Sequence, residues 1–290
     1  MTEIAALRPH RSVLYMPGSN ARALEKAKTI PADALILDLE DAVAPDAKSD
    51  ARAQVCDAVQ SGEYGDRILT IRVNGLDTAW HADDVAAAAE ARPTAIVVPK
   101  VNSAGEVRRI EAALDAAGAG ADVAIWAMIE TPTAILSVAE IAASTPRLTT
   151  LVMGTNDLIS ELRGLITSDR IALVGALSQS VLAARGAGKL ILDGVYNDVR
   201  DADGFAVECR QGRVLGFDGK TLIHPSQVGP CNTAFAPSAA DIEHARAVIE
   251  AFDESLRDGR GVATVNGKLI ENLHVADARR ILAFAEIIAG

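Results

Sequence analysis

Short apolar runs alternate with longer alanine-rich stretches of helical pattern along most of the chain. The runs expected to be strands are residues 12–16, 34–37, 68–73, 95–98, 123–129, 148–153, 189–192 and 214–217. Several are apolar at every position, which is typical of parallel strands buried on both faces. The intervening stretches are long enough for crossover helices, and Thr131 followed by Pro132 is typical of a helix N-terminus. The pattern therefore predicts an α/β fold in which eight strand–helix units close into a (β/α)8 TIM barrel.

The last part of the chain lacks this strand alternation. A stretch rich in Pro, Gly, Asn and Ser precedes Ser238, which is expected to cap a helix. A last helix is expected from about His274 to Ile288, after a glycine-containing turn. We therefore predict a catalytic barrel domain of residues 1–230 and a C-terminal helical segment of residues 231–290.

Composition and charge exclude several classes of protein. The chain has 290 residues with a net charge of −11, which argues against general binding to nucleic acid or to a membrane surface. Cys56, Cys209 and Cys231 are too few and too scattered for a disulfide framework or a zinc site. No apolar stretch reaches the roughly 20 residues that span a bilayer, and Met1–Pro9 lacks the pattern of a signal peptide. We expect a cytoplasmic protein without a nucleic-acid or membrane partner.

Charged residues gather where the expected strands end, which is where a parallel barrel places its functional groups. These positions carry Asp38, Glu40, Asp41, Arg72, Lys100, Glu130 and Asp157. Neither the histidines nor the cysteines show metal-ligand spacing, so a metal would be bound by oxygen ligands. Oxygen ligands are preferred by hard cations, and Mg²⁺ or Mn²⁺ is therefore expected. Glu130 and Asp157 are the expected ligands, and Glu40 and Asp41 are expected to surround them without binding the ion. The alternative is that each carboxylate caps the following helix or pairs with a neighbouring cation.

The basic residues at the strand ends have two interpretations each. Arg72 is either part of a salt bridge at the edge of the core or a fixed pair of donors for a carbonyl or carboxylate oxygen. Lys100 is either a Schiff-base amine, as in some barrel aldolases, or a lysine that is solvated or pairs with a substrate phosphate. The turn of residues 16–20 opens a helix that carries Arg22 and Lys26, and its amide groups are a weak candidate for binding a phosphate.

The charged residues at the strand ends fall within a set of seven motifs that resemble one known family. The chain is similar to the HpcH/HpaI aldolase and citrate lyase β-subunit group, in particular to its stand-alone acyl-CoA branch of malyl-CoA and citramalyl-CoA lyases and malyl-CoA thioesterases. The resemblance covers nearly the whole length. In chain order the motifs are Arg11–Asn20 (RSVLYMPGSN), Leu37–Val43 (LDLEDAV), Ile71–Asn74 (IRVN), Val98–Lys100 (VPK), Met128–Pro132 (MIETP), Gly154–Leu158 (GTNDL) and Ile223–Ser226 (IHPS).

The resemblance implies a role for each matching residue. It makes Glu130 and Asp157 the Mg²⁺ ligands, places Glu40 and Asp41 near the metal waters, and makes Arg72 face the thioester or enolate oxygen. It also implies a homotrimer or hexamer in which the C-terminal segment covers the active site of a neighbouring subunit. The residues implied in contact with substrate or coenzyme A are Pro17, Asn20, Arg22, Lys26, Lys48, Arg72 and Lys100.

One position departs from the family pattern. Acyl-CoA lyases carry a tail aspartate that enters the adjacent active site, whereas the matching stretch here, Gly267–Leu273, places Glu271 at that position. Glutamate keeps the carboxylate but moves it by about one methylene, and proton transfer depends on such distances. The alternative is a surface glutamate that follows a hairpin turn.

The favoured hypothesis is a Mg²⁺-dependent carbon–carbon lyase. It would cleave a malyl-CoA or citramalyl-CoA type ester reversibly to acetyl-CoA and a 2-oxo acid, either glyoxylate or pyruvate, with Arg72 and Glu271 as catalytic residues. The alternatives are a malyl-CoA thioesterase or malate synthase-like activity at the same site, and a citrate lyase β subunit acting on an acyl-carrier thioester. A glycoside hydrolase is disfavoured, because aromatic residues make up 3% of the chain and leave little surface for stacking on sugars.

Overall fold

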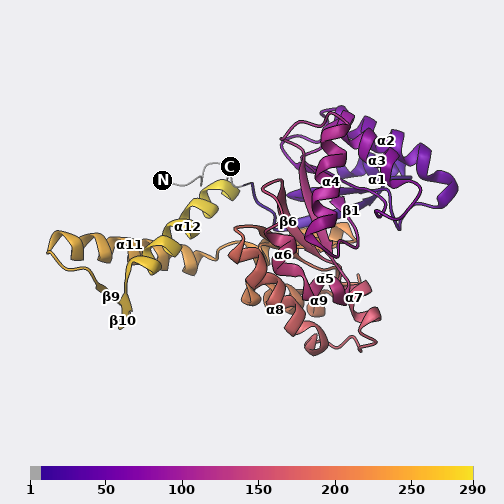
Figure 1. Ribbon diagram of the computed structural model, residues 1–290. Coiled ribbons are helices and arrows are strands. Elements are labelled where there is room, and N and C mark those ends of the chain that lie inside the picture. Colours follow the sequence, from indigo (N-terminus) through magenta and orange to yellow (C-terminus); the bar gives the residue numbers. More distant parts are fainter. Residues whose placement is uncertain (1–7, 290) are drawn as a thin grey trace. The chain divides into compact units, whose positions relative to one another are not determined.

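The computed structural model describes residues 8–289, and so most of the N-terminal stretch considered for a signal peptide lies outside the described residues. The described residues form two compact units, a larger one of residues 10–235 and a smaller one of residues 8–9 and 236–289, whereas the prediction placed the boundary at residue 230. The larger unit is a closed barrel of eight parallel strands in sequence order (Figure 1). Its strands are β1 (Ser12–Pro17), β2 (Ala34–Asp38), β3 (Ile68–Arg72), β4 (Ala95–Val98), β5 (Ala124–Ile129), β6 (Leu148–Met153), β7 (Leu190–Asp193) and β8 (Gly219–Leu222).

The predicted TIM barrel is confirmed, and seven of its strands lie where the apolar runs predict them. The prediction of the eighth strand is wrong, because residues 214–217 contain the end of a helix and β8 begins at Gly219. The true strand reads Gly-Lys-Thr-Leu and places Lys220 in the interior, where its side chain is fully buried. A search for apolar runs does not select β8, because this strand contains the charged residue Lys220. The acidic residues that neutralise Lys220, Asp193 and Glu208, lie outside the strand in the sequence.

Helices surround the barrel. They are α1 (Ala21–Ala27), α2 (Lys48–Gln60), α3 (His81–Ala91), α4 (Ala104–Ala116), α5 (Pro132–Leu136), α6 (Val138–Ala142), α7 (Thr155–Glu161), α8 (Ile171–Gly186), α9 (Ala202–Leu215) and α10 (Val228–Phe235), with short 3₁₀ helices at Pro45–Ala47 and Pro225–Gln227. The predicted start after Glu130 is confirmed, because the Thr131 side chain accepts a hydrogen bond from the Ala134 amide.

The barrel interior follows the two-residue period of its strands. Alternate side chains such as Val13, Ile36, Val97, Trp126 and Val152 form a buried cluster inside the barrel. A larger apolar cluster, made by the opposite strand faces and the helices, surrounds the sheet. The inward series runs on to the C-terminal ends of the strands, where polar side chains replace the apolar ones. The pairing of β2 with β3 sets Asp38 directly opposite Arg72 at this end.

The smaller unit contains α11 (Ala239–Arg257), β9 (Ala263–Val265), β10 (Lys268–Ile270) and α12 (Asn272–Ala289). Its two helices are predicted by the sequence, and Ser238 caps α11 as expected by accepting the amide of Asp241. The antiparallel pair β9–β10 is not predicted. Its turn is Asn266–Gly267, and both residues have positive φ angles of 50° and 75°, which is typical of a tight hairpin.

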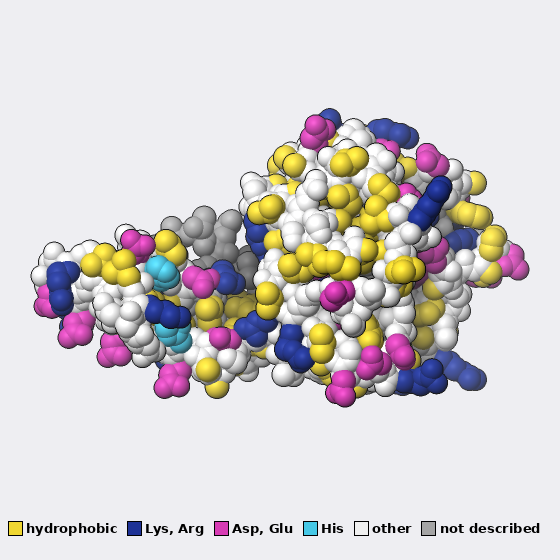
Figure 2. All heavy atoms as spheres, turned by 90° about the horizontal axis from the view of Figure 1, so that it is seen from below, with side chains coloured by type: hydrophobic (Ala, Val, Ile, Leu, Met, Phe, Trp, Pro, Cys, Tyr) yellow, Lys and Arg dark blue, Asp and Glu magenta, His cyan; other side chains and the backbone are white. Residues whose placement is uncertain are grey.

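The surface of the barrel carries exposed apolar side chains among charged ones. Leu136 on α5, Leu182 on α8 and Val214 on α9 are each at least 75% exposed. Figure 2 shows such hydrophobic side chains interspersed with acidic and basic ones on one face of the barrel. Among residues 8–289, no helix combines the length and the apolar character needed to cross a membrane.

Candidate active site at the C-terminal end of the barrel

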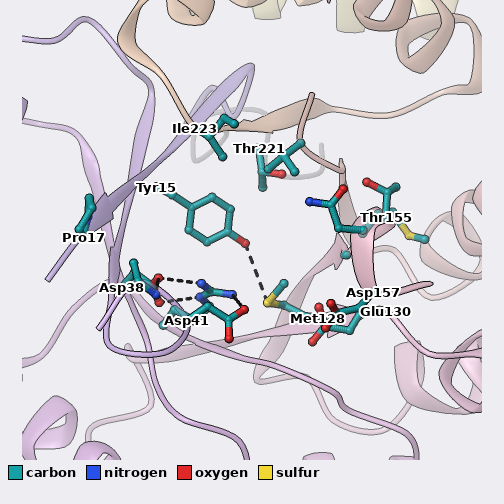
Figure 3. A pocket seen from close by; sticks show the side chains of 16 residues that line it. Tyr15, Pro17, Asp38, Asp41, Met128, Glu130, Thr155, Asp157, Thr221 and Ile223 are labelled. Atoms are coloured by element: carbon teal, nitrogen blue, oxygen red, sulfur yellow. Dashed lines mark hydrogen bonds and ion pairs between the residues drawn. The ribbon is translucent and has the colours of Figure 1, made fainter. Parts of the chain in front are cut away.

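A cavity of about 400 Å³ opens at the C-terminal ends of the strands (Figure 3). It brings together five of the residues that the sequence singles out, namely Pro17, Asp41, Arg72, Glu130 and Asp157. These residues come from β1, from the loop after β2, from β3, from the end of β5 and from α7. The lining also includes residues that sequence reasoning did not select as site residues, among them Tyr15, Asp38, Met128, Gly154, Thr155 and Thr221.

Arg72 is held by three carboxylates. Its Nε and Nη2 donate to the two oxygens of Asp38, each at 2.7 Å, and its Nη1 lies 2.6 Å from Glu40 Oε2. Asp41 is more distant, at 3.9 Å from the same nitrogen. The two interpretations of Arg72 are therefore combined in one residue. The paired donors of its Nε edge serve a salt bridge with Asp38, and only the remaining N–H groups of Nη1 and Nη2 are left for another oxygen.

Asp38 holds the arginine from a rigid position. The Asp38 carboxylate accepts the backbone amides of Glu40 and Ala42 at 2.9 and 3.2 Å. It is only 2% exposed. A carboxylate with four hydrogen-bond contacts does not reorient easily, so the guanidinium is fixed in the cavity wall before any ligand arrives.

Glu40 occupies an environment that favours its protonated form. Burial raises the pKa of Glu40 to about 7, although the Arg72 guanidinium opposes this and Asp41 adds to it. Glu40 therefore exchanges a proton near neutral pH while it lies against Arg72. This property suits a general base better than a purely structural counter-ion.

Glu130 lies at the end of β5 and is 3% exposed. Its Oε1 accepts the Lys100 amide at 2.7 Å, and Lys100 adopts a left-handed φ of 52° at this point. Gly154 is required beside it, because a Cβ at that position would overlap Oε2 and Cβ of Glu130. Burial raises the pKa of Glu130 to about 8; the Lys100 amide opposes this shift, and the Glu40 and Asp157 carboxylates add to it.

Asp157 lies next to Glu130 in the cavity wall (Figure 3) and is more open to solvent. Lys100 Nζ is 3.6 Å from Asp157 Oδ2. Partial burial lowers the pKa of Lys100, but the carboxylates of Asp157 and Glu130 outweigh it and raise that pKa above its ordinary value. A lysine that keeps its proton is a poor Schiff-base nucleophile, so the amine interpretation of Lys100 loses support.

The donor set fits a hard divalent cation with few protein ligands. Within residues 8–289, no three side chains of the His, Cys, Asp or Glu type are gathered as a metal cluster. Glu130 and Asp157 nevertheless line one cavity, and Glu130 Oε2 packs against Gly154 while Oε1 accepts the Lys100 amide. Mg²⁺ typically keeps several waters and takes only one or two carboxylates, so these two residues would suffice to hold it.

Lys48 does not fit its expected role in binding coenzyme A. It is 6% exposed, and its ammonium group donates to the carbonyls of Leu39 and Glu40 and to Asn74 Oδ1, each at 2.7 Å. An ammonium group has three donors, so none remains for a phosphate. Lys48 instead fixes the acidic loop after β2.

The other expected coenzyme A contacts lie around the first strand. Asn20 caps α1 by accepting the Ala23 amide at 3.1 Å, and Arg22 and Lys26 are exposed on that helix. Pro17 is in the cavity wall. This arrangement leaves Arg22 and Lys26 open to solvent beside the cavity strand, and their contact with coenzyme A stays a prediction.

Glu271 belongs to the smaller unit. It follows β10 directly and is exposed, and its amide donates to His274 Nδ1 at 3.0 Å. Its assignment to an active site of a neighbouring subunit stays a prediction.

Sequence reasoning placed Asp38 at a strand end without selecting it as a site residue, and it missed Tyr15. Both continue the inward-facing series of their strands, which the two-residue period could have revealed. Tyr15 stacks on Arg72, with 4.9 Å from the ring centre to the guanidinium carbon. Withdrawal from water raises the pKa of the Tyr15 phenol, partly opposed by Arg72, so the hydroxyl stays protonated at neutral pH.

A second charged cluster lies behind the cavity wall. Lys220 Nζ contacts Glu208 at 2.6 Å and Asp193 at 3.1 Å, and Arg170 Nη1 binds Asp193 at 2.8 Å. Burial raises the pKa of Asp193, but the positive charges of Lys220 and Arg170 outweigh this and hold that pKa below its usual range. Because Thr221 of the cavity wall donates to the Asp193 carbonyl, this cluster positions the β7–β8 side of the cavity.

The fold and the cavity define a barrel that brings an arginine together with the carboxyl groups of Asp38, Asp41, Glu130 and Asp157 at its strand ends. The chain belongs to the HpcH/HpaI aldolase/citrate lyase family, because residues 11–225 match the sequence pattern of that family. The family resemblance noted in the sequence is thereby confirmed.

Individual relatives cover nearly the whole chain. It is 52% identical over 282 residues to the (3S)-malyl-CoA thioesterase of Cereibacter sphaeroides, covering 97% of this chain and 96% of that protein. It is 35% identical to citrate lyase subunit beta of Escherichia coli, covering 97% and 94%. The structure of CitE from Mycobacterium tuberculosis in complex with magnesium, acetoacetate and coenzyme A matches with a TM-score of 0.79 at 31% identity, covering 97% of this chain and 99% of that one.

Proposed function

We propose that this protein hydrolyses the thioester of a short 3-carboxy-3-hydroxyacyl-CoA of the (3S)-malyl-CoA type, with Mg²⁺ as cofactor. The observation that carries the proposal is 52% identity, over 97% of the chain, to a (3S)-malyl-CoA thioesterase. The cavity supports it, because the two expected metal ligands, Glu130 and Asp157, and Arg72 all line it. This choice replaces the carbon–carbon lyase favoured from sequence alone by one of its stated alternatives.

Glu130 and Asp157 would hold the cation. When bound, Mg²⁺ supplies an electron-withdrawing anchor for the carboxylate and hydroxyl oxygens of the acyl group. The complex of the M. tuberculosis protein with magnesium, acetoacetate and coenzyme A supports this assignment, because that protein shares the fold at 31% identity. Mn²⁺ is an alternative with the same ligand preference.

Arg72 in the cavity wall and Glu40, which contacts Arg72 without lining the cavity, would divide the hydrolytic step between them. Water attacks the thioester carbon, and its proton passes to Glu40, whose pKa of about 7 is suited to accept it. The free N–H groups of Arg72 donate to the oxygen that becomes negative. The carbon–sulfur bond then breaks, the carbonyl forms again, and the proton on Glu40 returns to the coenzyme A thiolate.

Carbon–carbon cleavage is the second candidate function. The 35% identity to citrate lyase subunit beta favours it, because a lyase also places negative charge on the thioester oxygen. In that reaction Glu271 of a neighbouring subunit would exchange the proton of the acyl-CoA methyl group. The same identity keeps the role of a subunit in a multi-protein citrate lyase open to test by co-purification with acyl-carrier and transferase subunits.

The assembly that this role of Glu271 requires is a homotrimer or hexamer, with the C-terminal segment over the mouth of the next barrel. Mixing two inactive variants, Arg72→Ala and Glu271→Gln, tests it. Shared active sites regain activity on mixing, because some sites then receive both intact residues. Failure to regain lyase activity at any mixing ratio contradicts the shared site.

One experiment separates the two functions. The protein is incubated with Mg²⁺ and (3S)-malyl-CoA, and free coenzyme A, malate, acetyl-CoA and glyoxylate are measured separately. Hydrolysis releases equal amounts of coenzyme A and malate without acetyl-CoA, whereas cleavage releases acetyl-CoA and glyoxylate. Release of neither pair rejects both functions for this substrate. Glu130→Gln is the control, and it should be inactive because one of the two expected ligands loses its charge.

A further inference from the structure

Among residues 8–289, the only hydrogen-bond acceptor for the Tyr15 hydroxyl is a thioether sulfur. The hydroxyl lies 3.9 Å from Met128 Sδ, which is a weak acceptor, and it points into the space between the strands (Figure 3). Its ring is held against the Arg72 guanidinium, which fixes where the hydroxyl points. Tyr15 is only partly buried and lines the cavity, so its hydroxyl is available to a ligand that brings an acceptor into the cavity.

A second donor is useful at this position because Arg72 is largely neutralised. Asp38 takes one N–H each from Nε and Nη2, and Glu40 lies against Nη1. With Asp41 at 3.9 Å, three carboxylates surround one guanidinium. The bidentate pair with Asp38 by itself offsets the positive charge of the guanidinium, which weakens the attraction of Arg72 for a developing oxyanion. A neutral hydroxyl donor adds a hydrogen bond to such an oxygen without needing a further counter-ion.

We propose that the Tyr15 hydroxyl donates a hydrogen bond to the thioester oxygen of the bound acyl-CoA and is, beside Arg72, a second donor for the oxyanion. This inference rests on the proposed thioester hydrolysis. When water adds to the carbonyl carbon, the carbonyl electron pair moves onto this oxygen and the hydrogen bond from Tyr15 strengthens. Tyr15 keeps its proton throughout, and the pair returns to form the carbonyl as the carbon–sulfur bond breaks.

Packing alone does not require the hydroxyl. The neighbours of the Tyr15 ring are Arg72 on one side and the apolar interior cluster on the other. A phenylalanine would keep both contacts and lose only the long contact to Met128 Sδ. The Tyr15→Phe substitution therefore removes the proposed donor while it preserves the wall of the cavity.

The test compares steady-state kinetics of the wild type and of Tyr15→Phe with (3S)-malyl-CoA and Mg²⁺. The expected result is a fall in kcat of about 100-fold with KM raised by no more than about tenfold, since the hydrogen bond is stronger in the transition state than in the ground state. Tyr64→Phe is the matched control, because it removes a phenol that bonds the Leu24 carbonyl away from the cavity, and its kcat should stay unchanged. An unchanged kcat for Tyr15→Phe overturns the proposal.

A binding measurement keeps this inference separate from the proposed function. If the wild type hydrolyses no malyl-CoA, the proposed function fails, and calorimetric binding of malyl-CoA with Mg²⁺ to the same two proteins then tests the hydroxyl. Binding to Tyr15→Phe that is weaker by about threefold to tenfold supports a hydrogen bond to the ligand. Equal affinity overturns it.

Discussion

Gly154 provides a direct test of the cavity geometry, because its missing side chain leaves the space that Glu130 occupies. A Cβ built at residue 154 would lie 3.0 Å from Glu130 Cδ and would overlap Oε2 and Cβ of the same residue. To restore ordinary van der Waals contact the carboxylate must retreat by about 1 Å. Overpacking of this kind typically costs about 1–3 kcal/mol of unfolding free energy. The same displacement at a catalytic centre costs about 100-fold in rate.

The expected result for Gly154→Ala therefore has three parts. Mg²⁺ affinity measured by calorimetry falls at least about tenfold, kcat for thioester cleavage falls about 100-fold, and the unfolding free energy falls by about 1–3 kcal/mol. Gly175→Ala is the matched control, because Gly175 lies in α8 with no atom within 4 Å of an added Cβ. This control should stabilise the helix by about 0.5–1 kcal/mol and leave Mg²⁺ affinity unchanged. Wild-type affinity and rate in Gly154→Ala would show that Glu130 does not act from the position described.

Three further perturbations test the charges of the site. In the metal-free protein, burial raises the pKa of Glu130 from 4.5 to about 8, so the native state binds more protons than the unfolded state between these values. The stabilisation is full below about pH 4.5 and is lost as pH rises toward 8, and Glu130→Gln should remove this part of the slope in urea titrations. An identical slope in both proteins refutes the shift. Asp38→Ala leaves Arg72 without its paired acceptor, and should lower the unfolding free energy by about 3–5 kcal/mol and reduce kcat more than it raises KM. A stability within about 1 kcal/mol of the wild type would count against a tightly held pair. Lys220→Met removes one cation from the cluster around Asp193 and should cost about 3–5 kcal/mol in urea unfolding, whereas a neutral effect would mean that Arg170 alone compensates the two acids.

The sequence was sufficient for most of the fold. Continuous apolar runs predicted seven strands because burial on both faces leaves a signal in every residue of the strand. Thr131 and Ser238 predicted helix starts because capping depends on neighbours three residues away. The order of the seven motifs predicted the family. The eighth strand failed this method because Lys220 is buried through ion pairs with Asp193 and Glu208, which are remote in sequence.

The sequence predicted the site less completely. Arg72, Glu130 and Asp157 were found because they stand at strand ends, which all meet on one side of a parallel barrel. Lys48 was misinterpreted because the three oxygens that occupy its ammonium group come from two separate loops. The two-residue period places Tyr15 on the inward face of its strand, but it does not distinguish an aromatic residue that lines a cavity from one that fills the core.

What the sequence by itself determined is the set of elements and the chemical groups present at their ends. Only the tertiary structure decided how those groups are used. Closure of the barrel sets Asp38 opposite Arg72 and Gly154 against Glu130, and it thereby decides which charges are neutralised and which oxygens stay open. The physical reason is the distance along the sequence over which each interaction acts. Apolar periodicity and capping act over a few residues, whereas ion pairing, burial and pKa shifts depend on distances between side chains that only the folded barrel brings together.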